Sequence, residues 1–170
     1  MKLKLALFIL AAVVAPLAAA ADPVESGREH CVVNVAADDP LNLRAGPGTG
    51  HRVLARLPYA RCGIVVTAPC RGSWCEVEDG HFAGYVHRRY LAIVSPAIHC
   101  RSPHAGRHAV PIRAWPSEGS RVLAPLDGRR CDIALLPYRI EGWQKIRQAG
   151  WEGWVRLFDL DYMDHDIPGT

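Results

Sequence analysis

The sequence has no large excess of charge of either sign. Its 20 lysine and arginine residues stand against 17 aspartate and glutamate residues. Two of the lysines, Lys2 and Lys4, lie at the very start, and without them 18 basic residues remain against 17 acidic ones, a net charge of about +1. So neutral a chain has no broad positive field to attract nucleic acid or anionic lipid, and neither is expected as a partner.

The sequence also lacks an apolar run long enough to cross a membrane. The run Leu5–Val14 is far shorter than the about 20 residues that a spanning helix needs, and Pro16 follows it closely. Lys2 and Lys4 precede this run and small residues follow it, which is the pattern of a secretory signal. We therefore predict a signal peptide over residues 1–21, no membrane span after its removal, and a periplasmic or secreted location.

Signatures of nucleophilic and redox catalysis are missing as well. No Gly-x-Ser-x-Gly motif occurs, and Cys70 and Cys75 have four residues between them, which does not fit Cys-x-x-Cys. We expect no enzymatic activity, no catalytic residue and no cofactor.

The sequence does contain a gapless internal repeat with an offset of 69 residues. When Cys31–Leu91 is laid on Cys100–Leu160, 18 of 61 positions are identical. Arg44 falls on Arg113, for example, and Trp74 falls on Trp143. Two copies of one small fold therefore follow one another along the chain.

The six cysteines all follow the predicted signal, and an even number in an exported chain indicates disulfides. Since the repeat gives two pairs the same separation of 31 residues, the simplest pairing is Cys31–Cys62, Cys100–Cys131 and, in the first copy alone, Cys70–Cys75. The alternative bonds Cys31–Cys100 and Cys62–Cys131 would join the copies, and the residues leave that pairing open. A disulfide that closes about 31 residues stabilises a fold by roughly 3–4 kcal/mol, which a copy of about 60 residues needs because its core alone is marginal.

Short apolar–polar alternations between turn residues predict strands in both copies, and no segment has a long helical period. This favours an all-β chain of two small antiparallel barrels. The expected bounds are 31–94 for the first domain and 99–162 for the second, with a flexible leader at 22–30, a linker at 95–98 and a tail at 163–170. Val33 and Val35 are expected in the first strand, and Pro111 at a strand start or a sheet edge.

The first copy closely resembles the bacterial SH3 domain over residues 33–94. The matching features are the alternating strand Leu41–Arg44, the Gly-Pro-Gly loop Gly46–Gly48, Trp74 and the closing Gly84-Tyr85-Val86. Residues 100–162 resemble a degenerate copy, in which Trp115 replaces the first loop glycine. The resemblance implies two tandem SH3-like barrels of the bacterial envelope, in a family whose modules often bind peptidoglycan peptides. The family's binding residues cannot be matched to positions in this chain.

Four residues are candidates for ligand binding. Trp115 can form an exposed platform for a sugar ring or a peptide, or it can pack on the neighbouring copy. Arg113, like Arg44, is either a cation for a ligand carboxylate or a brace that bonds to loop carbonyls, and we favour the brace. Tyr59 and Tyr138 fall near loops and are the remaining candidates.

The other tryptophans are expected to pack in or near the core, because they recur at repeat-equivalent positions. These are Trp74, Trp143, Trp154 and, matched to Phe82, Trp151. His99, Cys100, His104 and His108 have spacings that zinc ligands can have, but Cys100 already has a repeat-equivalent partner, so no metal site is expected.

These observations together favour a non-catalytic binding module of the cell envelope that recognises peptidoglycan or its peptide stems. The alternative is a periplasmic adaptor that binds an envelope protein through its loops and Trp115.

Overall fold

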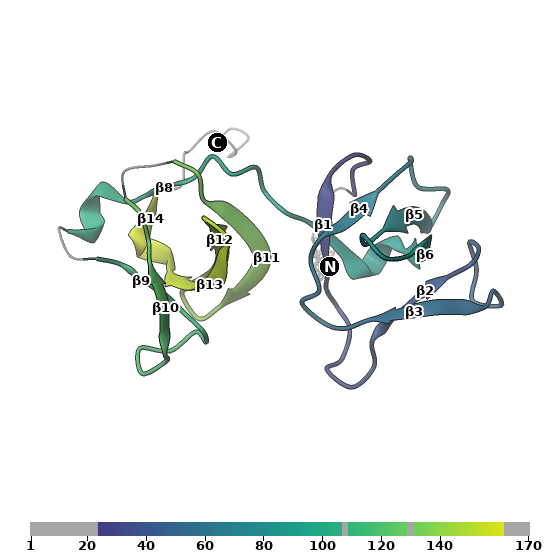
Figure 1. The fold of residues 1–170 in the computed structure, drawn as a ribbon, viewed down its shortest axis with the longest axis horizontal. Helices are drawn as coiled ribbons and strands as arrows, with labels where there is room; N and C mark the ends of the chain where they lie inside the picture. Colours follow the sequence, from purple (N-terminus) through teal and green to yellow (C-terminus); the bar gives the residue numbers. More distant parts are fainter. Residues whose placement is uncertain (1–23, 107–108, 129–130, 162–170) are drawn as a thin grey trace, which may run out of the picture.

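The computed structural model describes residues 24–106, 109–128 and 131–161 of the chain. The chain forms two lobes, each built on a curved antiparallel sheet, and a single segment joins them (Figure 1). The described helical segments are three single 3₁₀ turns, so the all-β class is confirmed. In the part of the chain that the structure describes, no helix has the length and hydropathy that a membrane crossing requires. The predicted signal peptide and the tail lie outside the described residues.

The first lobe holds a sheet of seven strands in the order β3-β2-β6-β5-β4-β1-β7. The strands are β1 (Glu29–Val32), β2 (Leu41–Arg44), β3 (Val53–Leu57), β4 (Ile64–Val66), β5 (Trp74–Glu78), β6 (Ala83–His87) and β7 (Leu91–Ile93), with the 3₁₀ turn η1 (Arg88–Tyr90) before β7.

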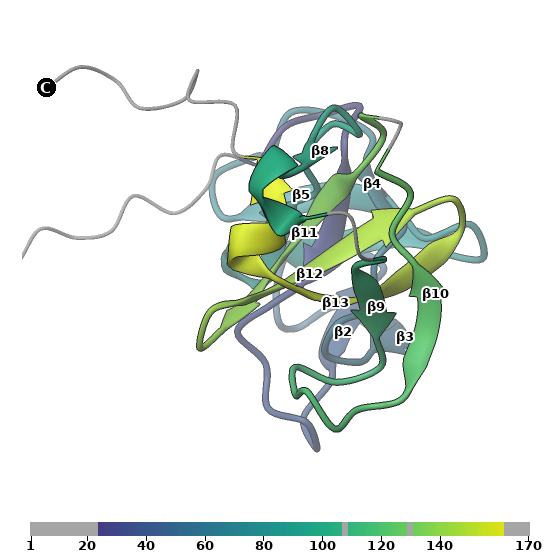
Figure 2. The ribbon, with the colours of Figure 1, turned by 90° about the vertical axis from the view of Figure 1, so that its left-hand side faces the viewer.

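The second lobe repeats this arrangement. Its elements are β8 (Cys100–Arg101), η2 (Pro103–Ala105), β9 (Pro111–Arg113), β10 (Val122–Pro125), β11 (Ala134–Ile140), β12 (Trp143–Gln148), β13 (Trp151–Arg156), η3 (Leu157–Asp159) and β14 (Leu160–Asp161). The main sheet has the order β10-β9-β13-β12-β11 (Figure 2). The short strands β14 and β8 pair with each other. An isolated bridge between His99 and Ile133 stands 69 residues after the His30–Ile64 pairing of the first lobe. Pro111 begins β9, as expected from its missing N–H.

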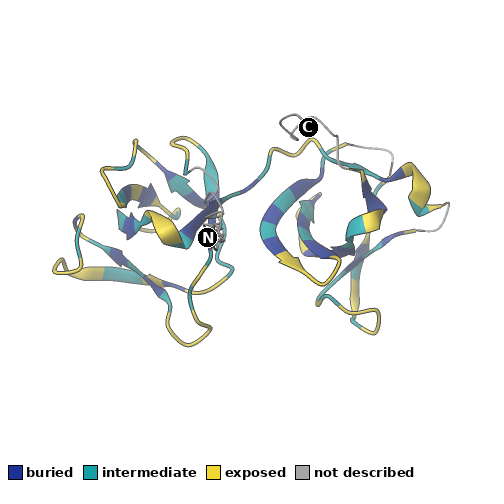
Figure 3. Ribbon diagram, turned by 180° about the vertical axis from the view of Figure 1, so that it is seen from behind, coloured by how far each residue is buried: buried dark blue, intermediate teal, exposed yellow. Residues whose placement is uncertain are grey.

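Each lobe has its own apolar core, to which alternate strand positions contribute. In β2, Leu41 and Leu43 are buried while the intervening Asn42 is half-buried. Figure 3 shows the buried positions on the strands and the exposed ones mainly in the turns. This alternation is the pattern that predicted the strands from sequence.

The first strand differs from its expected position. β1 starts at Glu29, inside the expected flexible leader, and ends at Val32, before Val33 and Val35. His30 is fully buried, and the backbone of Gly27 bonds to that of Val66. The boundary expected at residue 30 is therefore wrong. A histidine whose two ring nitrogens both find backbone partners can occupy a core position that sequence patterns assign to apolar residues.

Three disulfides close the two lobes. They join Cys31 to Cys62, Cys70 to Cys75 and Cys100 to Cys131, and no cysteine is left unpaired. All three bonds lie within a copy, so the alternative pairing between copies is wrong. Two of the bonds span 31 residues at repeat-equivalent positions.

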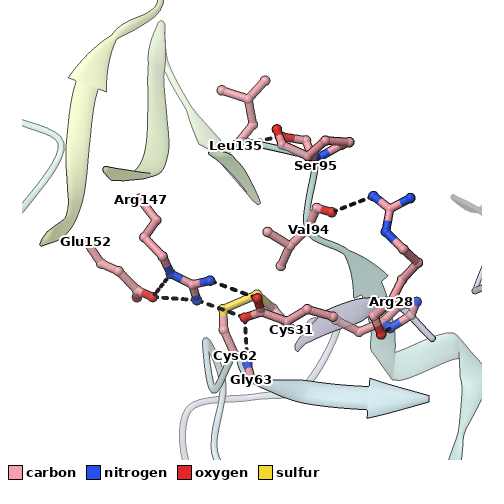
Figure 4. Close-up of polar contacts among 12 residues, drawn as sticks. Arg28, Cys31, Cys62, Gly63, Val94, Ser95, Leu135, Arg147 and Glu152 are labelled. Atoms are coloured by element: carbon pink, nitrogen blue, oxygen red, sulfur yellow. Dashed lines mark hydrogen bonds and ion pairs between the residues drawn. A yellow bond between two sulfur atoms is a disulfide. The ribbon is translucent and has the colours of Figure 1, made fainter. Parts of the chain in front are cut away.

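The lobes also contact each other directly. A shared apolar cluster joins Cys31 and Val94 of the first lobe to Leu136, Tyr138 and Trp143 of the second. The Tyr138 hydroxyl donates to the Val32 carbonyl at 2.8 Å. Ser95, between the lobes, bonds to Leu135 through both its backbone N–H and its side chain (Figure 4). These contacts hold the two copies together on either side of the short join.

Candidate functional site

The first lobe has a groove of about 350 Å³ where the loop before β2, the start of β5 and the β6–η1 corner meet. The side chains that give this groove its character are Asn34, Asp39, Asn42, Trp74, His87, Arg89 and Tyr90. They come from segments more than 50 residues apart in the sequence, so only the folded sheet assembles them.

Three rings form one wall of the groove. The His87 ring lies between Trp74, at 5.6 Å between centroids, and Tyr90, at 6.0 Å, and both pairs meet edge to face. His87 ends β6 and also caps η1, because its Nδ1 accepts the Arg89 N–H at 3.3 Å. This bond holds the His87 ring in place and starts the turn that presents Tyr90. All three rings are half-buried, which leaves part of each available to a ligand.

Polar side chains flank these rings. Asn34 has a left-handed backbone (φ 58°) and donates from Nδ2 to the Arg89 carbonyl at 2.9 Å, which ties the loop before β2 to η1. The exposed carboxylate of Asp39 and the exposed guanidinium of Arg89 both line the groove. Arg89 lies 5.4 Å from the centre of the Tyr90 ring, a cation–π distance. The groove can therefore offer aromatic surface, the Asp39 carboxylate and the Arg89 guanidinium to the same ligand.

Arg44, which also lines the groove, braces the adjoining loop. Its guanidinium donates to the carbonyls of Thr49 and His51, at 2.8 and 2.9 Å. Arg113 makes the equivalent bond to the Ser120 carbonyl, at 2.9 Å. These contacts agree with the bracing role favoured for both arginines.

The second lobe has a much smaller cavity at the equivalent place, of about 140 Å³. Each of its lining residues stands 69 positions after a lining residue of the first-lobe groove. Glu118 lies between two arginines here, 3.2 Å from Arg113 and 2.7 Å from Arg156. Arg156 in turn covers the Trp143 ring, with 4.3 Å from its guanidinium carbon to the ring centre. Charged groups of the protein itself thus occupy the face that is open in the first lobe.

Burial also affects the acid at the edge of this smaller cavity. Asp159 takes the place of Tyr90 and is buried, and this burial raises the pKa of its carboxyl above the ordinary value. Because Arg156 and Asp159 replace His87 and Tyr90, the second lobe has neither of these two rings at this site.

The structure does not bring the four sequence-predicted binding residues together. Trp115 lies in the β9–β10 loop with 72% of its surface exposed, so the alternative that it packs on the neighbouring copy is wrong. Tyr138 is buried between the lobes, and this burial raises the pKa of its hydroxyl. Tyr138 lies inside β11, not beside a loop, and its role as a ligand contact stays a prediction. Tyr59 packs edge to face on it, at 5.4 Å.

One core expectation also differs. Trp143 and Trp154 are buried and Trp74 is half-buried, but about half of Trp151 is exposed, as is its repeat-equivalent Phe82. Trp151 is the first residue of β13, and Phe82 directly precedes β6. Both therefore lie next to a hairpin turn at the end of a strand, where less of the sheet covers a side chain.

Sequence reasoning missed the groove residues Asn34, His87, Arg89 and Tyr90. A signal for them was present, because the repeat replaces these residues with Pro103, Arg156, Phe158 and Asp159. Positions that differ in chemistry between two copies of one fold can mark the surface at which the copies differ in function.

Among the residues that the structure describes, no group of three or more histidine, cysteine and acidic side chains could hold a metal ion. Of the histidine cluster considered from sequence, Cys100 is in a disulfide, and His108 lies outside the described residues.

Comparison with known proteins links the first lobe to a family. Residues 39–92 match the model of the bacterial SH3 domain. The curated proteins contain no match to the chain. Two solved structures of NlpC proteins from Trichomonas vaginalis are similar at low identity. NlpC2 is 14% identical with a TM-score of 0.38 over 84% of this chain and 51% of that one, and NlpC1 is 13% identical with a TM-score of 0.34 over 92% and 53%.

The chain spans about half the length of these two structures. The family match includes β2 to β6 and η1, and with them Trp74, His87 and Tyr90 of the groove wall. That the second lobe belongs to the same family stays a prediction. The chain therefore contains a bacterial SH3 domain, at residues 39–92 of its first lobe.

Proposed function

We propose that the chain is a non-catalytic binding module of the bacterial cell envelope, and that the first-lobe groove binds peptidoglycan through its peptide stems. The family match and the disulfides, which persist outside the reducing cytosol, fit an extracytoplasmic protein. A periplasmic or secreted location is part of this proposal.

The observation that carries the proposal is the contrast between the two equivalent cavities. In the first lobe three rings stand open beside Asp39 and Arg89, while in the second lobe the Arg113–Glu118–Arg156 ion pairs fill the same place. Peptide stems carry amino and carboxylate groups next to small side chains. Asp39 would receive an amino group, Arg89 a carboxylate, and the ring wall the chain between them.

Co-sedimentation with purified sacculi tests this function. The chain should sediment with the sacculi, and Trp74→Ala should weaken binding about tenfold or more, the usual effect of losing a central aromatic contact. Trp151→Ala is the matched control, because Trp151 is exposed and lines none of the described cavities. Circular dichroism checks that each variant is folded. The proposal fails if the unaltered chain stays in the supernatant, or if the folded Trp74 and Trp151 variants bind equally well.

A second function, as an adaptor for an envelope protein, is favoured by the exposure of two large rings on the second lobe. Trp115 and Phe158 are 72% and 70% exposed. Cross-linking should then capture one defined envelope protein, and Trp115→Ala should lose it while Trp74→Ala keeps it.

A further inference from the structure

A larger cavity, of about 670 Å³, lies between the two lobes. Its first-lobe wall comes from η1 and β7, and its second-lobe wall from β11 and the start of β12. We name this cavity the inter-lobe cleft. Its volume lies in the range of cavities that hold small ligands. Neither lobe forms the cleft alone, so it exists only because the lobes are in contact.

The charge of the inter-lobe cleft is entirely positive. Arg88, Arg89 and Arg139 line it, and none of its lining residues is an aspartate or a glutamate. Arg139 bonds to Gln144 at 3.2 Å. Arg88 and Arg89 are exposed, and within the described part of the chain no ion pair engages either guanidinium. By contrast, Arg147 and Arg156 both pair with glutamates of the protein.

The polar groups of the second-lobe wall have partners within the protein. The Tyr138 hydroxyl donates to Val32, and the Gln144 amide donates to the Leu136 carbonyl at 2.6 Å. The Ser95 hydroxyl accepts the Leu135 N–H at 2.7 Å. The Arg88 and Arg89 side chains are therefore the donors in the cleft that can bond to a ligand, and the planar fork of a guanidinium fits a carboxylate.

The inter-lobe cleft continues the first-lobe groove. Asn34 and Arg89 line both cavities, and the bond from the Asn34 side chain to the Arg89 backbone fixes the point where they meet. A ligand that lies along the ring wall can thus pass Arg89 and enter the cleft.

We propose that the inter-lobe cleft binds the carboxylate end of a peptide whose body lies in the first-lobe groove. Arg88 and Arg89 hold the carboxylate, and the apolar wall of Leu91 and Leu135 packs on the last small side chain. This wall favours a peptide end over a phosphate polymer, which has no apolar group beside its charge. The placement of the peptide body rests on the proposed function, whereas the carboxylate site rests on the cleft itself.

The test uses acetyl-trialanine with a free carboxylate as the probe and its C-terminal amide as the comparison, both titrated into the full chain and followed by ¹⁵N NMR. The acid should shift the amide signals of β7 and β11, and the amide form should bind about tenfold more weakly, the usual effect of losing a charge-assisted hydrogen bond. Arg88→Gln should weaken binding of the acid by the same factor. Arg56→Gln removes the same charge from β3, lines neither cavity, and should change nothing.

Three results would overturn the inference: equal binding of the acid and the amide, no effect of Arg88→Gln, or displacement of the acid by an equal concentration of inorganic phosphate. The proposed function is tested separately by sacculus binding and Trp74→Ala. If sacculi do not bind but the acid probe binds through Arg88, the carboxylate site stands and the peptidoglycan function fails. If sacculi bind through Trp74 while Arg88→Gln affects neither ligand, the function stands and the cleft site fails.

Discussion

At the scale of single residues, His30 shows how the burial of a histidine ring makes the stability of the fold depend on pH. The fully buried ring bonds the Arg28 carbonyl through Nδ1, at 2.9 Å, and accepts the Glu25 N–H at Nε2, at 3.3 Å. A carbonyl can only accept, so the proton is on Nδ1 and the ring is neutral. Burial is the largest cause that lowers the pKa of His30 below its usual 6.5.

The sign of the pH effect follows from that lowered pKa. Between the folded and unfolded pKa values the unfolded chain binds the additional proton, so stability rises with pH there. The free energy of unfolding should be at its full value above about pH 6.5 and should fall as the pH drops below it. Urea unfolding from about pH 7 to pH 5 should show this slope in the natural chain and lose most of it in His30→Gln. His81→Gln, at an exposed turn histidine, is the control and should keep the slope. The same slope in His30→Gln as in the natural chain would contradict the assignment.

At the scale of elements, a glycine allows two strands to cross closely in each lobe. A Cβ at Gly84 in β6 would lie 2.5 Å from the Arg44 carbonyl oxygen of β2, and one at Gly153 in β13 would lie 2.6 Å from that of Arg113 in β9. Backbone atoms cannot move aside as a flexible side chain can. This explains why the repeat keeps this glycine in both copies while it replaces Gly46 with tryptophan.

We therefore expect Gly84→Ala to lower the free energy of unfolding by about 2 kcal/mol, the typical cost of overpacking a site that cannot relax. Gly50→Ala is the matched control, since nothing lies within 4 Å of a Cβ there, and its effect should stay within about 0.5 kcal/mol. Urea titration of both variants measures the difference. Equal stability of the two variants would show that β2 and β6 can separate without cost.

The elements differ in how far the sequence could predict them. β2, β3, β5 and β6 follow local alternation and turn residues, so their positions were predictable. The start of β1 was not, because a buried histidine interrupts the apolar pattern. β11 runs for seven residues where β4 has three, and this added length buries Tyr138 against the other lobe. Such burial depends on a neighbour that no local pattern records.

The candidate site was less predictable than the strands. Trp74 and His87 meet because β5 pairs with β6, and Asn34 reaches Arg89 across 55 residues of sequence. The sequence singled out Trp115 because a tryptophan replaced a glycine in a loop, but it left open whether this side chain is exposed or packs on the other copy. The structure shows that it is exposed. The difference between the two copies was not predictable either. The second copy has a smaller cavity because Glu118 forms ion pairs there with Arg113 and Arg156, and these pairs become evident only in the structure.

At the scale of the whole molecule, a bidentate ion pair joins the lobes beside the Cys31–Cys62 disulfide (Figure 4). Both terminal guanidinium nitrogens of Arg147 donate to the Glu29 carboxylate at 2.8 Å, and its Nε donates to the Glu152 carboxylate at 2.8 Å. The hydrogen bond from Arg147 is the largest cause that lowers the pKa of Glu29. The inter-lobe cleft needs the lobes in contact, so this pair between the lobes supports the proposed carboxylate site.

A double-mutant cycle on Glu29→Gln and Arg147→Gln measures that support. The two side chains are 30% and 31% exposed and paired through two hydrogen bonds, so we expect a coupling of about 1 kcal/mol in the free energy of unfolding at pH 7, at the upper end for pairs near a surface. The matched control is the pair Glu25 and Arg28 within the first lobe, which makes a single contact at 3.5 Å. Its side chains are 48% and 39% exposed, so its coupling should be close to zero. Salt at about 1 M should reduce the coupling of the first pair, because screening weakens charges that water reaches. A coupling no larger than that of the control pair would mean that the apolar cluster around Tyr138 holds the lobes together without help from charge.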